Sequence, residues 1–309
     1  MADTTPHAAG RAARIAALGY DYDAQPKESL AACNLCGADA FVVLTHRDRY
    51  GFPAQAHACA RCGLVFLNPR MTAAAYGRFY DGIYRPLVSA FHGRQIDALT
   101  IQAEQKEYAI ERAEFIRPFV TGGGRRSMLD IGGSTGVVAH HFATTFALDG
   151  TLIDPAPLEV EQARRLGLET ISGLVEAHDF GRRRFDMVVI CQTVDHLLDV
   201  AGTLSRVRQI LADDGLFFVD IVDFRAAYLR NRSVEGAVKI DHPYYLTEAT
   251  MTAFLGRSGF EILRTDYAAD HLHVSYVCRP GASQPGTRPD PASVTALLRE
   301  VRFVQNTPT

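Results

Sequence analysis

The periodicity of apolar residues changes along the chain and divides it into regions of different structure. Near the N-terminal end, short β-rich pieces such as FVVLT and LVFL lie between turns that contain cysteine, which predicts small hairpins. From Thr72 to Phe119 apolar residues recur at helical spacing, first in TAAAYGRFYDGIY and then in a longer helix that we expect Pro118 to end. Strand-like and helix-like segments then alternate, which predicts an α/β domain.

The alternating region predicts a mostly parallel sheet. Five apolar segments are expected to be strands, namely SMLDI, GTLID, LETIS, FDMVVICQ and LFFVDIV. The helices between them should cover the sheet through right-handed crossovers, and the last of these helices is expected to span VAGTLSRVRQILADDG. Two later segments, EILRTDY and LHVSYVCR, are close enough in sequence to form an antiparallel hairpin at the sheet edge.

These patterns divide the chain into five expected parts. They are a flexible arm at 1–27 with at most one short helix, a metal-binding module at 28–69, a helical connector at 70–118, an α/β domain at 119–280 with an insert at about 222–246, and a C-terminal tail at 281–309. Within the tail, ASVTALLREVRFV predicts one last helix.

Charge and composition bear on possible partners. Of 309 residues, 47% are hydrophobic, which is enough for a substantial core, and the formal net charge is -3. Lysine occurs only at Lys27, Lys106 and Lys239, so no basic tract favours nucleic acid or an anionic membrane, and nucleic acid is not an expected partner. Because the sequence shows neither an apolar run of about 20 residues nor a signal-peptide pattern, we expect a cytoplasmic protein without a membrane span.

The cysteines predict a metal site. Four of the six form two C-x-x-C pairs, each followed by glycine: Cys33, Cys36, Cys59 and Cys62. Four thiolates fill a tetrahedral site and leave no position for water, so we expect structural zinc. A redox or disulfide role is the weaker alternative, and His57 is not needed as a ligand. Cys191 and Cys278 lie alone in expected strands and are interpreted as core residues.

A glycine turn, LDIGGSTG, follows the first strand of the α/β domain. Its glycines do not have the G-x-G-x-x-G spacing of a dinucleotide loop, but Asp130, Gly132, Ser134 and Gly136 give the pattern acidic-x-G-x-small-x-G. This string resembles motif I of the class I S-adenosylmethionine (SAM)-dependent methyltransferases. The resemblance implies a Rossmann-like class I methyltransferase sheet with SAM as cofactor, bound near Asp130, Gly132, Gly133, Ser134 and Gly136. A simple tight turn, or a nicotinamide enzyme, is the alternative.

Residues after the loop extend the expected cofactor site. Asp154 ends the second strand about twenty residues later, where a carboxylate can accept hydrogen bonds from both ribose hydroxyls. By the resemblance, Gln192 lines the methionine portion and Val175 lies near the adenine, with its neighbours Leu174 and Glu176. The Asp195-His196 pair matches a Glu-His pair of the family, and a structural role in the turn is the preferred interpretation of His196.

The sequence motifs before the α/β domain narrow the resemblance to one group of methyltransferases. The order of cysteine pairs, GLVFLNPR and FYDGIY, followed by the SAM motif, resembles bacterial sugar and polysaccharide methyltransferases, including zinc-containing dTDP-sugar C-methyltransferases, from Cys33 to about Arg279. The resemblance implies that Tyr80 and Tyr84 lie at the mouth of the SAM pocket; packing in the core of the connecting helices is an equal alternative.

The insert after the fifth strand is expected to carry the acceptor site. Related enzymes have a Glu-His pair followed by aromatic residues there, and Asp241-His242 followed by two tyrosines is the counterpart in this chain. Histidine can remove a proton near neutral pH and a neighbouring carboxylate can fix its tautomer, so His242 is predicted as general base and Asp241 as its partner. A purely structural role for the pair is equally open. Three arginines flank the insert and are candidates to bind a phosphate of a nucleotide-sugar: Arg225, Arg230 and Arg232.

The expected class of methyl acceptor depends on one difference between this chain and the C-methylating sugar enzymes. The C-methylating sugar enzymes continue into a further C-terminal domain, whereas about thirty residues follow Arg279 here, so O-methylation of a sugar, nucleotide-sugar or glycan hydroxyl is expected. An RNA methyltransferase with a zinc ribbon is one alternative, and a SAM-fold binding module without catalysis is another. The sequence predicts no oligomeric state.

Overall fold

The glycine turn follows one strand of a seven-stranded sheet. The computed structural model describes residues 6–120 and 127–306. The strands are β6 (Ser127–Ile131), β7 (Asp149–Asp154), β8 (Glu169–Ser172), β9 (Phe185–Ile190), β10 (Leu211–Val222), β12 (Phe260–Tyr267) and β13 (His273–Pro280). Their order in the sheet is β12-β13-β10-β9-β6-β7-β8. β6 lies between β7 and β9, so the order of the strands along the chain reverses at β6. Ligands of such sheets usually bind at the carboxyl ends of the strands beside this reversal.

The sheet is mostly parallel, as predicted. β8, β7, β6, β9 and β10 pair in parallel, and their buried runs, such as FDMVVI, suit strands covered on both faces. β12 and β13 pair antiparallel at one edge, which confirms the predicted hairpin. The fold is therefore the Rossmann-like α/β sheet that the sequence predicts.

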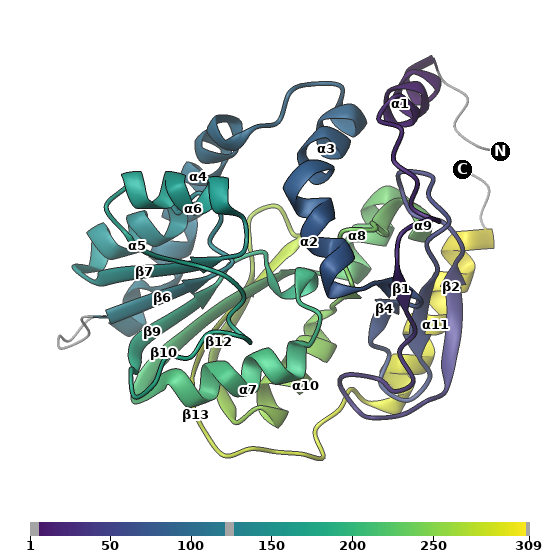
Figure 1. The fold of residues 1–309 in the computed structure, drawn as a ribbon. Helices are drawn as coiled ribbons and strands as arrows, with labels where there is room; N and C mark the ends of the chain where they lie inside the picture. The colour runs from purple at the N-terminus through teal and green to yellow at the C-terminus, as the bar shows by residue number, and fades with distance from the viewer. Residues whose placement is uncertain (1–5, 121–126, 307–309) are drawn as a thin grey trace. The chain divides into compact units, whose positions relative to one another are not determined.

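Helices cover both faces of this sheet (Figure 1). On one face lie α4 (Ala98–Val120), α5 (Val137–Phe146) and α6 (Pro157–Arg165), and their buried residues form one hydrophobic cluster with Met128, Leu152 and Phe218 from the strands. On the other face lie α7 (Val200–Ile210) and α10 (Glu248–Arg257). Burial of both faces excludes water from every central strand.

Two predicted helix ends were wrong. α4 does not end at Pro118 but continues to Val120, because a proline near a helix end removes only one backbone hydrogen bond and the chain still packs as a helix. α7 ends at Ile210, and LADDG belongs to β10, which has an irregular register between Leu211 and Leu216. Leu211 is buried, so tertiary packing overrides the helical propensity of these residues.

The chain forms two compact units. The first comprises the described residues up to Asp97, Val222–Thr250, and the described residues from Arg288 onward. The second comprises Ala98–Ile221 and Met251–Thr287, and contains the seven-stranded sheet. The helical stretch 70–118 thus divides between the units, and the insert at 222–246 lies in the same unit as the cysteine pairs.

A four-stranded antiparallel sheet organises the first unit. Its order is β11 (Tyr244–Tyr245), β4 (Val65–Leu67), β3 (Ala56–Cys59) and β2 (Phe41–Thr45). A short ladder pairs β1 (Lys27–Glu28) with β5 (Arg70–Met71). The insert therefore contributes an edge strand to the sheet that contains Cys59, a connection that local sequence patterns do not reveal.

Six helices complete the described part of the first unit. They are α1 (Pro6–Ala16), α2 (Ala73–Gly82), α3 (Tyr84–His92), α8 (Phe224–Asn231), α9 (Val234–Ala237) and α11 (Pro291–Asn306). The short N-terminal helix and the last helix are as predicted. α11 packs beside the cysteine turns, since Val294 and Leu297 lie next to Gly63. Among the described residues, no helix combines the length and apolar character needed to cross a bilayer.

Candidate functional site

The glycine turn between β6 and α5 has the backbone conformation that its sequence requires. Gly132 has φ 69°, and a side chain there would overlap Thr193, so only glycine fits. The Gly132 amide donates to Ile153 O at 2.8 Å, and the Gly136 amide donates to Gly133 O at 2.9 Å. These bonds hold the turn against the end of β7, and α5 begins directly after the turn.

Asp154 fixes the other side of this turn. Its Oδ2 accepts from the Ser134 amide at 3.0 Å, and its Oδ1 accepts from the Ala156 amide at 2.8 Å. The Ser134 hydroxyl donates to Glu159, and the Gly173 amide donates to Asp154 O at 3.0 Å. The ends of β6, β7 and β8 are thereby tied together, which brings the predicted residues of the loop and the second strand side by side.

Asp130 is a buried carboxylate that lacks a hydrogen-bond partner. Its side chain is fully buried on β6, and among the described residues neither carboxylate oxygen has a partner. Burial raises the pKa of Asp130 to about 8, and the negative charges of Asp154 and Asp220 add to the effect. A side chain at Gly133 would overlap this carboxylate. An unsatisfied buried carboxyl is costly, so its retention here indicates a ligand that supplies a donor.

Asp220 on β10 is a member of the site that the sequence reasoning missed. Its Oδ1 accepts from the Gln192 amide at 2.7 Å, and its Oδ2 accepts from Arg112 Nε at 2.9 Å and from the Tyr108 hydroxyl. The Gln192 backbone has φ 50°, so this bond stabilises an uncommon conformation after β9. An acid within the apolar segment LFFVDIV was the available sequence signal, since a charge inside a buried strand needs a partner.

Arg112 and Cys191 complete the buried cluster around Asp220. Although burial opposes it, the charge of Asp220 raises the pKa of Arg112, whose guanidinium lies 4.1 Å from the Tyr108 ring centroid. Among the described residues, Arg112 Nη2 is buried without a partner. Burial, reinforced by Asp220 and Asp130, keeps the pKa of Cys191 well above its ordinary value, so this thiol is neutral. The predicted strand FDMVVICQ ends at Ile190, just before this cysteine.

The predicted adenine region has mixed exposure. Val175 is buried and Leu174 is 47% exposed, while Glu176 Oε1 accepts from the Thr203 hydroxyl at 2.5 Å. Asp195 and His196 lie in a short 3-10 helix (Val194–His196), and the His196 amide donates to Thr193 O at 3.0 Å. The backbone therefore turns directly after β9, as the structural interpretation of this pair predicts.

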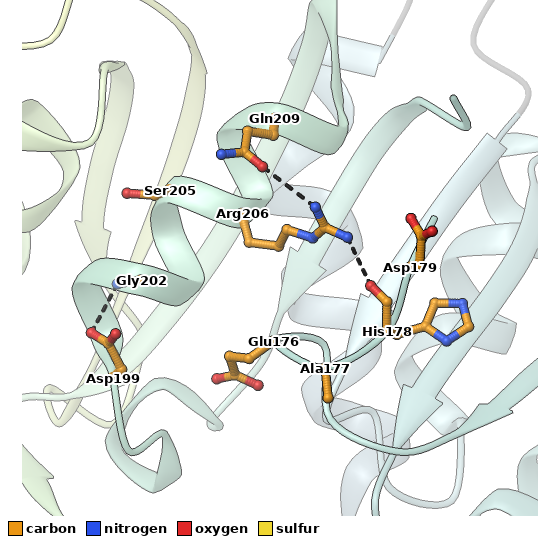
Figure 2. A pocket seen from close by; sticks show the side chains of 9 residues that line it. All are labelled: Glu176, Ala177, His178, Asp179, Asp199, Gly202, Ser205, Arg206 and Gln209. Carbon is orange, nitrogen blue, oxygen red and sulfur yellow. Dashed lines mark hydrogen bonds between the residues drawn. The ribbon is translucent and has the colours of Figure 1, made fainter. Parts of the chain in front are cut away.

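A hollow of about 440 Å³ lies beside this region, and Figure 2 shows the residues that line it. It lies between residues 176–179 and one face of α7, and Arg206 crosses it by donating from Nη2 to His178 O at 2.7 Å. Its lining is Glu176, Ala177, His178, Asp179, Asp199, Gly202, Ser205, Arg206 and Gln209. None of these residues belongs to the glycine turn or to the cluster of buried carboxylates. The hollow is thus separate from the chemistry at the carboxyl ends of β6 and β7.

The four predicted cysteines converge in the first unit. Sγ atoms lie 3.5 Å apart in the pairs Cys33–Cys62 and Cys36–Cys59, and all four lie within 4.8 Å of one another. Hydrogen bonds from Cys33 and Cys62 lower the pKa of the Cys59 thiol, whereas the same mutual contacts raise that of Cys62. A tetrahedral zinc site with Zn–S distances of about 2.3 Å separates its sulfurs by about 3.8 Å, so this cluster fits zinc.

Asp241 and His242 are buried in the insert, in the same unit as the cysteines. Asp241 is 1% exposed and His242 is 6% exposed, and His242 Nε2 lies 3.3 Å from Asp241 Oδ2. Lys239 Nζ also lies 3.3 Å from His242 Nε2, a neighbour that the sequence reasoning did not include. The predicted dyad therefore exists as a close pair, with an ammonium beside it.

Tyrosines and an aspartate hold the backbone of this segment. The Tyr80 hydroxyl donates to Asp241 O at 2.8 Å, and the Tyr76 hydroxyl donates to Ile240 O at 3.1 Å. The Tyr245 hydroxyl accepts from the Lys239 amide at 2.8 Å and donates to Lys239 O at 2.6 Å. Asp48 accepts from the Ile240 amide at 3.0 Å. Residues 239–242 are consequently fixed at several points.

The remaining predicted residues have structural neighbours. The Tyr80 and Tyr84 rings pack edge to face at 5.3 Å and both residues are partly exposed, so their position at the mouth of the SAM pocket stays a prediction. Arg225 forms an ion pair with Glu300 at 2.8 Å and is 57% exposed. Arg232 ends α8 with φ 49°. Arg225 therefore already has an anionic partner within the chain.

Comparison with protein families supplies the deciding observation. The family model of a methyltransferase domain matches residues 101–265, more than half of the chain. The chain belongs to this methyltransferase family. Together with the fold, this makes residues 101–265 a methyltransferase domain.

Curated and solved methyltransferases show how far the likeness extends. The ubiquinone biosynthesis O-methyltransferase of Methylocella silvestris is 33% identical over 97 residues, which is 29% of this chain and 38% of that protein. This chain thus aligns with well under half the length of that curated relative. The structure is similar to magnesium protoporphyrin IX methyltransferase from Synechocystis PCC 6803 with bound SAH, with TM-score 0.53, 11% identity, and coverage of 68% and 100% of the two chains. It is also similar to mitomycin 7-O-methyltransferase, with TM-score 0.50, 18% identity, and coverage of 67% and 60%.

Replacing Asp130 by asparagine is expected to make the stability of the methyltransferase less dependent on pH. The folded-state pKa of about 8 lies above the value of about 3.9 expected in the unfolded chain, so this carboxyl favours folding below about pH 4 and loses that contribution as the pH rises to 8. Asparagine does not ionise. The free energy of unfolding of Asp130→Asn, relative to the wild type, should therefore rise between pH 5 and pH 8 by on the order of a few kcal/mol.

Urea denaturation at several pH values measures this difference. Asp149→Asn, at the exposed start of β7, is the matched control and should leave the pH profile unchanged. A stability difference between Asp130→Asn and the wild type that does not vary with pH would contradict the assignment of a raised pKa.

Proposed function

We propose that the carboxyl ends of β6 and β7 bind SAM through Asp130 and Asp154. The unsatisfied, buried carboxyl of Asp130 carries this proposal, because the ammonium of an amino acid moiety would supply the donor that it lacks. Asp154 keeps a carboxylate at the end of the neighbouring strand, where it can accept from the ribose hydroxyls. Gly132, Gly133, Ser134 and Gly136 let the cofactor approach the backbone, with Val175 and Gln192 toward its two ends.

Arg112 is a further candidate for this cofactor site. Its Nε is held by Asp220, while Nη2 is buried and has no partner among the described residues. A guanidinium donor fixed in this way suits a carboxylate, which the methionine portion of SAM carries. Asp130 and Arg112 would then recognise opposite charges of the same amino acid moiety. The fixed orientation given by Asp220 reduces the cost of ordering the arginine side chain.

The acceptor is a hydroxyl of a sugar, nucleotide-sugar or glycan, with His242 as general base. When bound, SAM supplies a sulfonium-activated methyl group, so the chain must align the hydroxyl and take its proton. Asp241 Oδ2 lies 3.3 Å from His242 Nε2 and can stabilise the imidazolium that forms when the ring takes the hydroxyl proton. The similarity to an O-methyltransferase supports oxygen as the methylated atom.

Lys239 tunes this base. Its ammonium, 3.3 Å from His242 Nε2, disfavours the imidazolium, whereas the Asp241 carboxylate favours it. The Asp241 carboxylate can stabilise the positive charge that develops on the imidazole when the proton arrives. Because tyrosines hold the backbone on either side, both neighbours stay close to the imidazole.

His242→Asn is expected to lower the rate of methyl transfer by about 10²-fold or more, because the side chain that accepts the proton is removed. The measurement is release of S-adenosylhomocysteine (SAH) with a panel of nucleotide-sugars and glycans. SAH binding should be unchanged, since the cofactor residues lie in the other compact unit. His46→Asn, an exposed histidine of the same unit, is the control and should keep the full rate.

Equal rates for His242→Asn and the wild type would contradict the assignment of the base. Transfer to RNA but to no sugar-containing acceptor would contradict the acceptor class and favour the RNA alternative. SAH binding without transfer to any acceptor of the panel would favour the non-catalytic module.

We further propose that the four cysteines hold one structural zinc ion. The fit of their sulfur positions to a tetrahedral site supports this, and no cysteine of the set is left for a water-bound, catalytic arrangement. The role would be to join two turns of the first unit. The sheet that contains Cys59 also contains β11, so loss of the metal should loosen the segment next to Asp241.

Removing the metal is therefore expected to unfold the first unit at lower temperature. Purified protein should contain about one zinc per chain by metal analysis, and Cys59→Ser or a strong chelator should lower the midpoint of thermal unfolding by several degrees. Cys278→Ser, in β13 of the other unit, is the control and should retain the zinc. Full metal content in Cys59→Ser, or its absence from the wild type, would contradict the site.

A further inference from the structure

The segment that carries the proposed base has neither helical nor strand structure. This base segment, residues 238–242, lies between α9 and β11. The His242 amide donates to Lys239 O at 3.1 Å, which closes one turn within the segment. Ile240, inside this turn, is fully buried, and buried backbone outside helices and strands needs hydrogen-bond partners from elsewhere. The position of the base therefore depends on other parts of the first unit.

The loop between β2 and β3, in the same unit, supplies two of these partners. Asp48 of this loop is completely buried, and its Oδ2 accepts from the Ile240 amide at 3.0 Å. The Arg49 amide donates to Val238 O at 2.9 Å. The two bonds reach alternate residues of the base segment, so the loop holds the segment at two points.

The Asp48 carboxylate also fixes its own loop. Its Oδ1 accepts from the Tyr50 amide at 3.0 Å and from the Phe52 amide at 2.9 Å. The Gly51 amide donates to Asp48 O at 3.0 Å, and Gly51 has φ 92°, so the backbone turns sharply around this side chain. The two carboxylate oxygens thus have different partners: Oδ1 holds the loop, and Oδ2 holds the base segment.

These three contacts require a side chain that accepts at both of its terminal atoms. All three partners of the carboxylate are N–H donors. An ionised carboxylate accepts at both oxygens, whereas asparagine has one oxygen and one NH₂ group. If asparagine kept its oxygen on the Tyr50 and Phe52 amides, its NH₂ group would face the Ile240 amide, donor against donor. Asparagine at position 48 would therefore keep the loop and lose the bond to the base segment.

We propose that Asp48 is a positioning residue for methyl transfer, which holds the base segment so that His242 stays in its reactive place. Asp48 acts through the backbone of Ile240, two residues before the base. A displacement of about 1 Å at a reacting group can lower a rate on the order of 10²-fold, so a tether of this kind affects turnover. This inference deepens the proposed function and rests on it for the identity of His242 as the base.

Asp48→Asn is expected to lower kcat for methyl transfer at least about tenfold, because the base is no longer held in place. The KM for the acceptor should change much less than kcat, and SAH affinity should not change, since the cofactor residues lie in the other unit. Burial raises the pKa of Asp48 to about 7, so the rates are compared at about pH 8.5, where the wild-type carboxylate is ionised. Asp21→Asn is the control: Asp21 is exposed, accepts from the Ala24 amide at 3.1 Å, and should keep the full rate as asparagine.

A second pair of variants tests the same loop if Asp48→Asn does not fold. Gly51 is exposed at φ 92°, and a side-chain carbon there would meet no atom within 4 Å. Gly51→Ala should therefore strain the turn around Asp48 without a clash and lower kcat at least about threefold. Gly19→Ala is the matched control, because Gly19 is also exposed, has φ 63° and is equally free of close atoms.

Amide hydrogen exchange measures the tether without turnover. Peptides that contain residues 238–242 should exchange faster in Asp48→Asn than in the wild type. Unchanged exchange would overturn the inference, and so would equal kcat in Asp48→Asn, Gly51→Ala and the wild type, although equal rates would retain the proposed function. Faster exchange in Asp48→Asn, with no methyl transfer by the wild type to any acceptor, would retain the tether and remove the proposed function.

Discussion

The structure depends on the burial of carboxylates where the parallel strands end. Asp130 and Asp220 are completely buried, and Asp154 is nearly so, although each lies at or near the carboxyl end of its strand. Burying a carboxylate costs free energy, and two of these acids differ in how that cost is offset. Asp220 receives an arginine, a tyrosine and a backbone amide, so its charge becomes part of the framework. Asp130 receives no hydrogen bond from the described chain, and in the proposed function a ligand supplies the donor.

This division explains why neighbouring acids can have different roles. A satisfied carboxylate fixes α4 and the turn after β9, which gives the site its shape. An unsatisfied buried carboxyl costs free energy, and a bound donor offsets that cost. In the first unit, the same distinction separates Asp48, which accepts hydrogen bonds from three backbone amides, from Arg11 and Arg49, whose Nε atoms have no hydrogen-bond partner among the described residues.

Much of the fold follows from local patterns. The alternation of strands and helices predicts the parallel sheet and its edge hairpin, and the cysteine pairs predict the four-sulfur cluster. Pro118 and the LADDG segment show the limit of such patterns, because packing against the sheet decides where those helices end. The pairing of β11 with β4 joins residues almost 180 positions apart, and no local signal specifies it.

The residues of the candidate site that belong to a sequence motif were predictable, whereas the residues that hold other side chains in position were not. Asp130, Asp154 and the four cysteines lie in recognisable spacings. Asp220 and Arg112 act through a contact between distant segments, so their residue types alone do not identify them. Asp48 reaches the base segment only when the fold brings the loop between β2 and β3 next to the insert.

The most direct test of this account is calorimetric titration of the purified protein with SAH, alongside Asp154→Ala and the control Asp149→Ala from the exposed start of the same strand. The account predicts one site per chain with a Kd of about 1 µM to 100 µM, unchanged in the control and at least about tenfold weaker in Asp154→Ala, because hydrogen bonds to a charged group are lost. No binding to the wild type, or equal binding by Asp154→Ala, would contradict the cofactor site proposed at the ends of β6 and β7.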